Sequence, residues 1–286
     1  MRAPDSAGQL VGGRYRLEVR ITGPGPAAGW CAVDELLGRT VVLRRLPAGV
    51  SLAGEPLAAV RAAARLTDSR VARIFDADDA GECPYLVCER VPGEHLDDLI
   101  LTAGLPGPDL AALIVAEAAD VLAGAHEAGA PHLHLTPRSL LWGRDGLRIT
   151  GLGIEEALHR AVTAAPAGPP GEPLPAADAR ALGEVLYAML TGYWPGQRPS
   201  ALPAAPRLRG MPYAPRQVRP GVPGAMNAVT CRALGLPRHP EPPFRGPAEL
   251  ADALRQPARS WPVSARLPAV PRPSALARRP VFGRAA

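Results

Sequence analysis

A chain of 286 residues can form one large domain or two lobes with a sizeable core, and its 47% hydrophobic residues exclude disorder throughout. No apolar run reaches the roughly 18 residues that a membrane span needs, and residues 1–14 contain no apolar signal-peptide core. The net charge of +5 comes from residues 258–286, which hold six arginines and no acid. The remaining 26 arginines against 27 acids argue against a nucleic-acid-binding core.

The sequence contains no lysine, so all 32 basic residues are arginine. A GC-rich codon bias explains this on the surface, but it also means that no active site in the chain has a lysine. The four cysteines are scattered and form no Cys-x-x-Cys pair, so neither a zinc site nor a disulfide framework is predicted. A reducing, cytoplasmic location is expected.

The first third of the chain predicts a β-rich unit. Short runs that mix apolar and polar residues, separated by turn residues, are typical of strands. One alanine-rich run with a proline near its start is typical of a helix. The predicted strands are residues 14–20, 30–33, 40–45, 71–75 and 85–89, and the predicted helix is residues 56–66.

After residues 92–93 the pattern becomes helical. Apolar residues recur at helical spacing over 109–127 and 178–191, with Asp178 and Gly192 suited to the two ends of the second helix. Two further helices are predicted at 225–234 and 247–255, a hairpin at 140–150, and a proline-rich loop at 195–223.

This order of elements predicts an α+β fold in which a small β-rich lobe with one helix is joined by a hinge to a larger α-helical lobe. The prolines and arginines of the last segment favour an extended or disordered tail. The expected boundaries are a flexible N-terminus over 1–11, the small lobe over 12–92, the large lobe over 93–256 and the Pro/Arg-rich disordered tail over 257–286.

Four segments, in their order and spacing, resemble the bacterial serine/threonine protein kinases of the eukaryotic-like type. They correspond to the opening strand, the hinge, the central helix and the late helical region of that family. The resemblance covers roughly residues 12–256 and implies a bilobal protein-kinase-like fold. The four segments are residues 13–17, 84–93, 177–192 and 215–234.

The resemblance also implies a catalytic machinery of a lysine–glutamate pair, a catalytic aspartate and two metal-holding residues, and this chain departs from each. The aspartate and asparagine of the catalytic loop are replaced within residues 132–139, and the Asp-Phe-Gly motif reads Gly-Leu-Gly at 151–153. The degenerate positions are Arg44 for the lysine, Ala59 (or Glu55 in a shifted register) for its glutamate, His134 for the aspartate, Ser139 for the asparagine and Gly151 for the metal-binding aspartate.

The positions that resemble the ATP pocket are also altered. Thr22, Pro24 and Ala27 fall at the three glycine positions of the phosphate-covering loop, where prolines remove backbone donors. Val42 replaces a small residue beside adenine. Two histidines two residues apart lack a third ligand, so no metal is predicted. No cofactor is therefore expected, neither ATP nor Mg²⁺, and the vestigial pocket is assigned to Val42, Cys88 at the gatekeeper position, Glu89 and Val91.

His132 and Asp178 match family residues that brace the catalytic loop, and Leu152 can fill the slot of the motif's phenylalanine. A kept skeleton with lost chemistry predicts a pseudokinase, a regulatory or scaffolding binding module in serine/threonine kinase signalling. The expected partner is a protein, either an active kinase or a phosphopeptide-binding domain, with Thr163 and Thr191 as candidate phosphorylation positions.

Two alternatives stay open at this point. The first is a metal-independent nucleotide-binding switch, in which the hinge backbone near Glu89 and Val91 holds adenine. The second is a kinase-family enzyme with weak, non-standard activity that uses Arg44 and His134 on a bound nucleotide.

Overall fold

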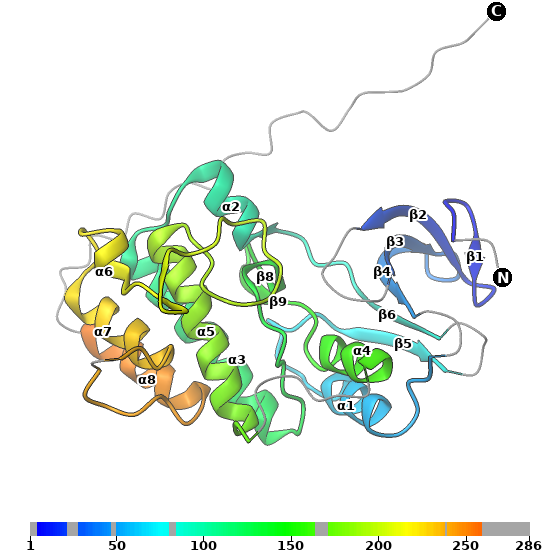
Figure 1. The fold of residues 1–286 in the computed structure, drawn as a ribbon. Coiled ribbons are helices and arrows are strands. Elements are labelled where there is room, and N and C mark those ends of the chain that lie inside the picture. Colours follow the sequence, from blue (N-terminus) through cyan, green and yellow to red (C-terminus); the bar gives the residue numbers. More distant parts are fainter. Residues whose placement is uncertain are drawn as a thin grey trace, which may run out of the picture.

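The computed structural model describes residues 5–21, 28–46, 50–79, 84–163, 171–237 and 239–258. The chain folds into a β-rich lobe and a larger helical lobe (Figure 1), and the predicted two-lobed α+β architecture is confirmed. Among the helices of the described part, none is long and apolar enough to cross a membrane.

The small lobe is built on one six-stranded sheet with the order β1-β2-β3-β4-β6-β5. Side chains alternate between the faces of a strand, so Val41 and Leu43 enter one core while Val42 and Arg44 lie on the opposite face. The strands are β1 (Leu10–Val11), β2 (Tyr15–Ile21), β3 (Ala28–Asp34), β4 (Arg39–Arg45), β5 (Ile74–Asp78) and β6 (Tyr85–Glu89).

Two helices cover the second face of this sheet, α1 (Glu55–Ala64) and α4 (Ile154–Thr163) (Figure 1). α4 follows the hairpin over residues 140–149 of the large lobe in sequence but packs on α1 of the small lobe, so it joins the two lobes. A separate apolar cluster forms where α1, α4 and the sheet meet. Its buried members are Leu46, Leu52, Val60, Leu86, Ile154, Ala157 and Leu158.

The large lobe surrounds the long helices α3 (Pro108–Glu127) and α5 (Leu174–Thr191). Almost every residue of α5 is buried, and Gly183 lets α7 approach so closely that a Cβ would collide with Ala233. The other elements are β7 (Glu94–His95), α2 (Leu96–Ala103), the 3-10 turn η1 (Pro137–Ser139), β8 (Leu140–Gly143), β9 (Gly146–Ile149), β10 (Arg207–Leu208), β11 (Met211–Pro212), α6 (Pro215–Val218), α7 (Gly224–Ala233) and α8 (Pro247–Ala258).

Several predicted boundaries are wrong. The strand expected at 71–75 is β5, which begins at Ile74, because Val71 forms only an isolated bridge to Ile149. The central helix begins at Leu174 rather than Asp178, since Pro175 is tolerated in its first turn. The segment 195–223, which was expected to be a loop, contains the β10–β11 hairpin and α6. Neither α2 nor α4 was predicted from the sequence.

Within residues 1–11, which were expected to form a flexible N-terminus, the described part contacts the small lobe, and the flexibility itself stays a prediction. β1 pairs with β2, and Asp5 accepts an ion pair from Arg45 at 2.7 Å. The expected disordered tail over 257–286 lies outside the described residues except at its start, where α8 continues to Ala258.

Candidate functional site

Arg44, at the position of the family's lysine, forms an ion pair with Glu155 at the start of α4. Its Nη1 lies 2.7 Å from Oε1 and its Nη2 lies 3.3 Å from Oε2, so the contact is two-pronged. The side chains are only 13% and 18% exposed, which limits screening by water. The carboxylate that engages this arginine therefore comes from α4.

The residues aligned with the family's glutamate have other roles. Glu55, at the amino end of α1, forms an ion pair with Arg160 of α4 at 2.5 Å. The carbonyl of Ala59 packs against Gly153, where a Cβ would lie 3.0 Å from the oxygen. The sequence did not point to Glu155, although Ile154, Ala157 and Leu158 stand at helical spacing beside it.

Gly151, at the position of the metal-binding aspartate, has φ of +85°. A Cβ added there would lie 2.8 Å from Cγ of Glu155 and 3.6 Å from Nε2 of His132. Both the backbone conformation and the space are thus suited to glycine. The next residue, Leu152, is buried in the core of the large lobe.

His134, at the position of the catalytic aspartate, is held on both ring nitrogens. Its Nε2 lies 2.9 Å from Glu156, and its Nδ1 accepts a hydrogen bond from Nε of Arg198 at 3.3 Å. Because Nδ1 is the acceptor, the proton of the neutral ring is on Nε2, directed at the carboxylate. The ring also packs against His159, with centroids 4.8 Å apart.

The same Arg198 reaches the catalytic-loop backbone and donates to the carbonyl of Leu133 at 2.5 Å. Leu133 has φ of +58°, an unfavourable conformation for a leucine. The guanidinium thus contacts both the His134 ring and the loop backbone, and burial lowers its pKa from the usual value. This contact joins residues that are far apart in sequence and has no local sequence signal.

Asp178 and His132 both hold the backbone of the loop over residues 132–139 in place. The carboxylate of Asp178 is fully buried and accepts hydrogen bonds from the backbone N–H groups of His132 and Leu133, at 2.8 and 2.7 Å. It also contacts Nε2 of His126 at 2.9 Å. His132 is fully buried, its Nε2 bonds the carbonyl of Thr150 at 3.0 Å, and burial lowers its pKa.

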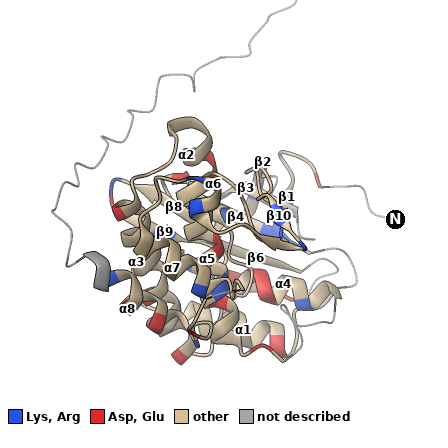
Figure 2. Ribbon diagram, turned by 60° about the vertical axis from the view of Figure 1, so that its left-hand side comes forward, with Lys and Arg blue, Asp and Glu red and all other residues tan. Residues whose placement is uncertain are grey.

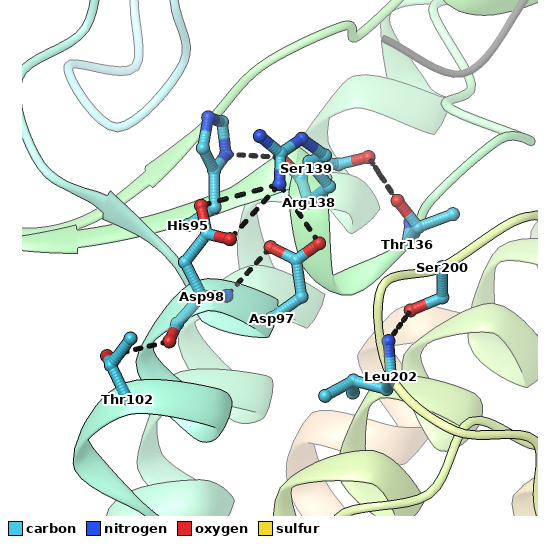
Figure 3. A network of polar contacts seen from close by, with 9 residues as sticks. All are labelled: His95, Asp97, Asp98, Thr102, Thr136, Arg138, Ser139, Ser200 and Leu202. Carbon is cyan, nitrogen blue, oxygen red and sulfur yellow. Dashed lines mark hydrogen bonds and ion pairs between the residues drawn. The ribbon is translucent and has the colours of Figure 1, made fainter. Parts of the chain in front are cut away.

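Ser139 closes the loop and faces its own turn. Its hydroxyl accepts from the backbone N–H of Thr136 at 3.2 Å and lies 3.4 Å from the Thr136 hydroxyl, a contact drawn in Figure 3. Beside it, Arg138 lies between Asp97 and Asp98 at the start of α2, at 3.2 and 3.4 Å, and its carbonyl contacts Nδ1 of His95 (Figure 3). These contacts attach the loop to α2.

The hinge residues complete the site. Val42 pairs with Cys88 across β4 and β6, and the Cys88 thiol points to the Val42 carbonyl at 3.6 Å. Burial raises the pKa of Cys88 to about 12, so the thiol stays protonated. Glu89 is partly buried, which opposes ionisation, but hydrogen bonds from Arg148 and the Arg73 backbone outweigh this and lower its pKa. Val91 is partly exposed. The phosphate-loop positions Thr22, Pro24 and Ala27 lie outside the described residues.

Comparison with known proteins agrees with this architecture. No model of a known protein family matches the chain. The chain is 26% identical, over 86% of its length, to a probable serine/threonine-protein kinase PknB of Corynebacterium glutamicum, and 28% identical, also over 86%, to PknA of Mycobacterium tuberculosis. It covers 42% and 62% of those two relatives, so it spans about half the length of the curated relatives that it matches.

Among solved structures, Rad53 1–466 in complex with AMP-PNP superposes with a TM-score of 0.60 at 18% identity, over 85% of this chain and 65% of that one. The fold is that of the protein kinases. The relatives named as serine/threonine kinases support that family for this kinase-like domain.

Proposed function

We propose that this kinase-like domain does not transfer phosphate and acts as a regulatory or scaffolding binding module in serine/threonine kinase signalling. The observation that carries the proposal is Gly151 and its neighbour Glu155. The glycine supplies no carboxylate, and the glutamate side chain takes the adjacent space and engages Arg44.

The other metal-holding position supports the same proposal. Mg²⁺ prefers oxygen ligands, and in kinases it neutralises the charge that develops on the phosphates. Ser139 offers only a hydroxyl, and that hydroxyl is engaged within its own turn. Since neither Gly151 nor Ser139 presents a carboxylate or amide oxygen, the residues present do not fit a kinase magnesium site.

The position of the catalytic base argues in the same direction. A general base must reach the substrate hydroxyl with a free lone pair. Both nitrogens of His134 are engaged, by Glu156 and by Arg198, so neither lone pair is free for a substrate hydroxyl. Asp178 and His132 brace the loop backbone, which suits a protein-binding scaffold.

A partner that phosphorylates this domain would find one of the two candidate positions accessible. Thr191 is buried and donates its hydroxyl proton to the Tyr187 carbonyl. Thr163 is exposed at the end of α4. An active kinase or a phosphopeptide-binding domain remains the proposed partner.

The test is a thermal-shift titration with ATP, alone and with Mg²⁺ or Mn²⁺, alongside a phosphoryl-transfer assay on the same sample. A nucleotide at ~100 times its Kd would add roughly 2.7 kcal/mol to the free energy of unfolding. We expect no metal-dependent shift and no transfer to a generic substrate. A metal-dependent shift together with transfer would refute the proposal, and a metal-independent shift would indicate a nucleotide-binding switch.

A further inference from the structure

One stretch of the large lobe carries charge of a single sign. Residues 185–240 contain no aspartate or glutamate but seven arginines, at positions 198, 207, 209, 216, 219, 232 and 238. The body of the protein is otherwise close to neutral, so this concentration is local. Figure 2 marks arginines in blue at α6 and beside β10.

The β10–β11 hairpin presents two of these arginines on an exposed turn. Leu208 pairs with Met211, which leaves Arg209 and Gly210 as a two-residue turn with φ of +51° and +82°. Positive φ at both positions is the pattern of a type I′ turn, for which asparagine and glycine are preferred. Arginine is unfavourable at position 209, and strained residues of this kind are concentrated at functional sites.

Two arginines of this stretch, Arg207 and Arg219, bond backbone carbonyls instead of carboxylates. Arg207 donates to two backbone carbonyls, those of Gly210 and Pro195. Arg219 likewise donates to the carbonyl of Leu190 at 3.2 Å. Among the described residues, no carboxylate lies within ion-pair distance of Arg207, Arg209, Arg216 or Arg219, and these four arginines are called the arginine face below.

One buried acid acts electrostatically on Arg207 without forming an ion pair with it. Glu184 pairs with Arg180 inside the lobe, at 3.1 Å, and its side chain is almost completely buried. The hairpin and α6 are held next to one another, because the Tyr213 backbone donates to Pro206 at 3.1 Å, just before Arg207. Arg216 follows in α6 and is exposed.

An exposed apolar residue lies beside the charges. Leu208 is 59% exposed next to Arg209 of the turn, on the side of β10 opposite to Arg207. Tyr193, at the exit of α5, is also exposed. A protein segment with acidic residues and an apolar side chain would complement this surface. Its carboxylates would pair with the guanidinium groups, and its apolar side chain would remove Leu208 from water.

We propose that the arginine face and Leu208 form the docking surface for an acidic segment of a partner protein, with an apolar residue of that segment covering Leu208. This inference names the partner chemistry for the binding role proposed above and therefore rests on it. The two proposals fail on different measurements, because phosphoryl transfer tests the first and peptide binding tests the second.

Nucleic acid and lipid are less suited to this surface. Specific duplex binding neutralises about 6–10 phosphates, more than four arginines can contact. A phosphate backbone also offers nothing apolar to cover Leu208. An anionic membrane attracts a polybasic cluster of about 4–8 residues on an extended or helical segment, whereas these arginines are fixed on a hairpin and a single helical turn.

The experiment measures fluorescence anisotropy of a labelled peptide of about 12 residues that contains glutamate, aspartate and two leucines. The matched probe carries glutamine and asparagine in place of the acids. We expect the acidic peptide to bind more tightly than the neutral one, and R209E/R216E to weaken its binding about tenfold. L208S should weaken it by a similar factor. R144E, on the exposed β8–β9 turn, is the matched control and should leave binding unchanged.

Arg209→Asn separates a binding role from a structural one. Asparagine suits the turn, so this variant should melt no lower than the wild type while it binds the acidic peptide about threefold more weakly. Equal binding of the two peptides, or an equal effect of R144E and R209E/R216E, would overturn the proposal. Tighter arginine-dependent binding of single-stranded DNA or of phosphatidylserine vesicles would overturn the assignment to an acidic protein segment.

Discussion

Position 151 combines two constraints that a single residue type can satisfy. Its φ of +85° disfavours every side chain, and the space in which a Cβ would project is taken by Glu155. Because both constraints act together, the packing requires glycine at this position. Substituting aspartate for Gly151 would therefore lower the stability of the fold.

We predict that Gly151→Ala lowers the free energy of unfolding by more than Gly146→Ala. Gly146 has nearly the same φ, +88°, but nothing lies within 4 Å of its Cβ position. The conformational cost is therefore shared, about 1 kcal/mol in each. The clash with Glu155 should add about 1 kcal/mol at position 151. Urea denaturation of both variants gives the difference.

The double variant Gly151→Ala/Glu155→Ala provides the internal check. Removing the side chain that meets the new Cβ should recover the part of the loss that comes from the clash, while the conformational cost remains. If the two glycine variants are equally destabilised, the packing argument at position 151 is wrong.

At the scale of elements, α4 determines how the two lobes meet. It packs on α1 and beneath the sheet, and its first turn supplies Glu155 to Arg44 and Glu156 to His134. Arg160 then bonds both Glu156 and Glu55, at 2.5 Å each. α4 thus contacts β4 and α1 of the small lobe and the loop over residues 132–139 of the large lobe.

We predict that Arg44 and Glu155 are energetically coupled. In a double-mutant cycle of R44A, E155A and the double variant, the coupling should be about 1–2 kcal/mol, because the pair is two-pronged and mostly shielded from water. Arg16 and Glu35, 2.6 Å apart with side chains 46% and 41% exposed, form the matched control pair. Their coupling should stay below about 0.5 kcal/mol.

A coupling no larger than that of the surface pair would contradict the role given to α4. Hydrogen exchange gives an independent readout, since E155A should accelerate exchange in α4 more than in α3. Equal acceleration in both helices would mean that the substitution acts on global stability alone.

The sequence allowed positions to be assigned by resemblance but gave no sign of the contacts made there. Arg44, His134, Ser139 and Gly151 are assigned from the order of the strands and the central helix around them, and their assignment stays a prediction. Glu155 was not predicted as a site residue, because its contact with Arg44 depends on how the helix Ile154–Thr163 packs against the small lobe.

Other contacts had no local signal at all. Arg198 reaches His134 across 64 positions of sequence, and the partnership depends on where the loop after α5 is folded. The β10–β11 hairpin has strands of two residues each, too short for an alternating pattern to be detected. Tertiary placement, rather than propensity, decides these features.

At the scale of the whole molecule, we predict that the buried His132 and the half-buried His159 make stability depend on pH. Burial lowers the pKa of His132, and burial together with the adjacent His134 lowers that of His159. Glu156, Arg160 and Arg198 are the charged groups around His159. Unfolded histidine titrates at about 6.5, so below that pH the unfolded chain binds more protons than the folded one.

Stability should therefore fall as pH decreases below about 6.5, and it should be fully present above that value. Glu184 acts in the opposite sense, because burial raises its pKa and its contribution is lost as pH rises through the folded value. The measurement is the urea midpoint from about pH 5 to about pH 8 for the wild type, H159Q and E184Q. H159Q should flatten the profile and E184Q should steepen it, since each removes one of the opposing groups. A wild-type midpoint that rises as the solution is acidified from pH ~7 to pH ~5.5 would show that the histidines do not dominate.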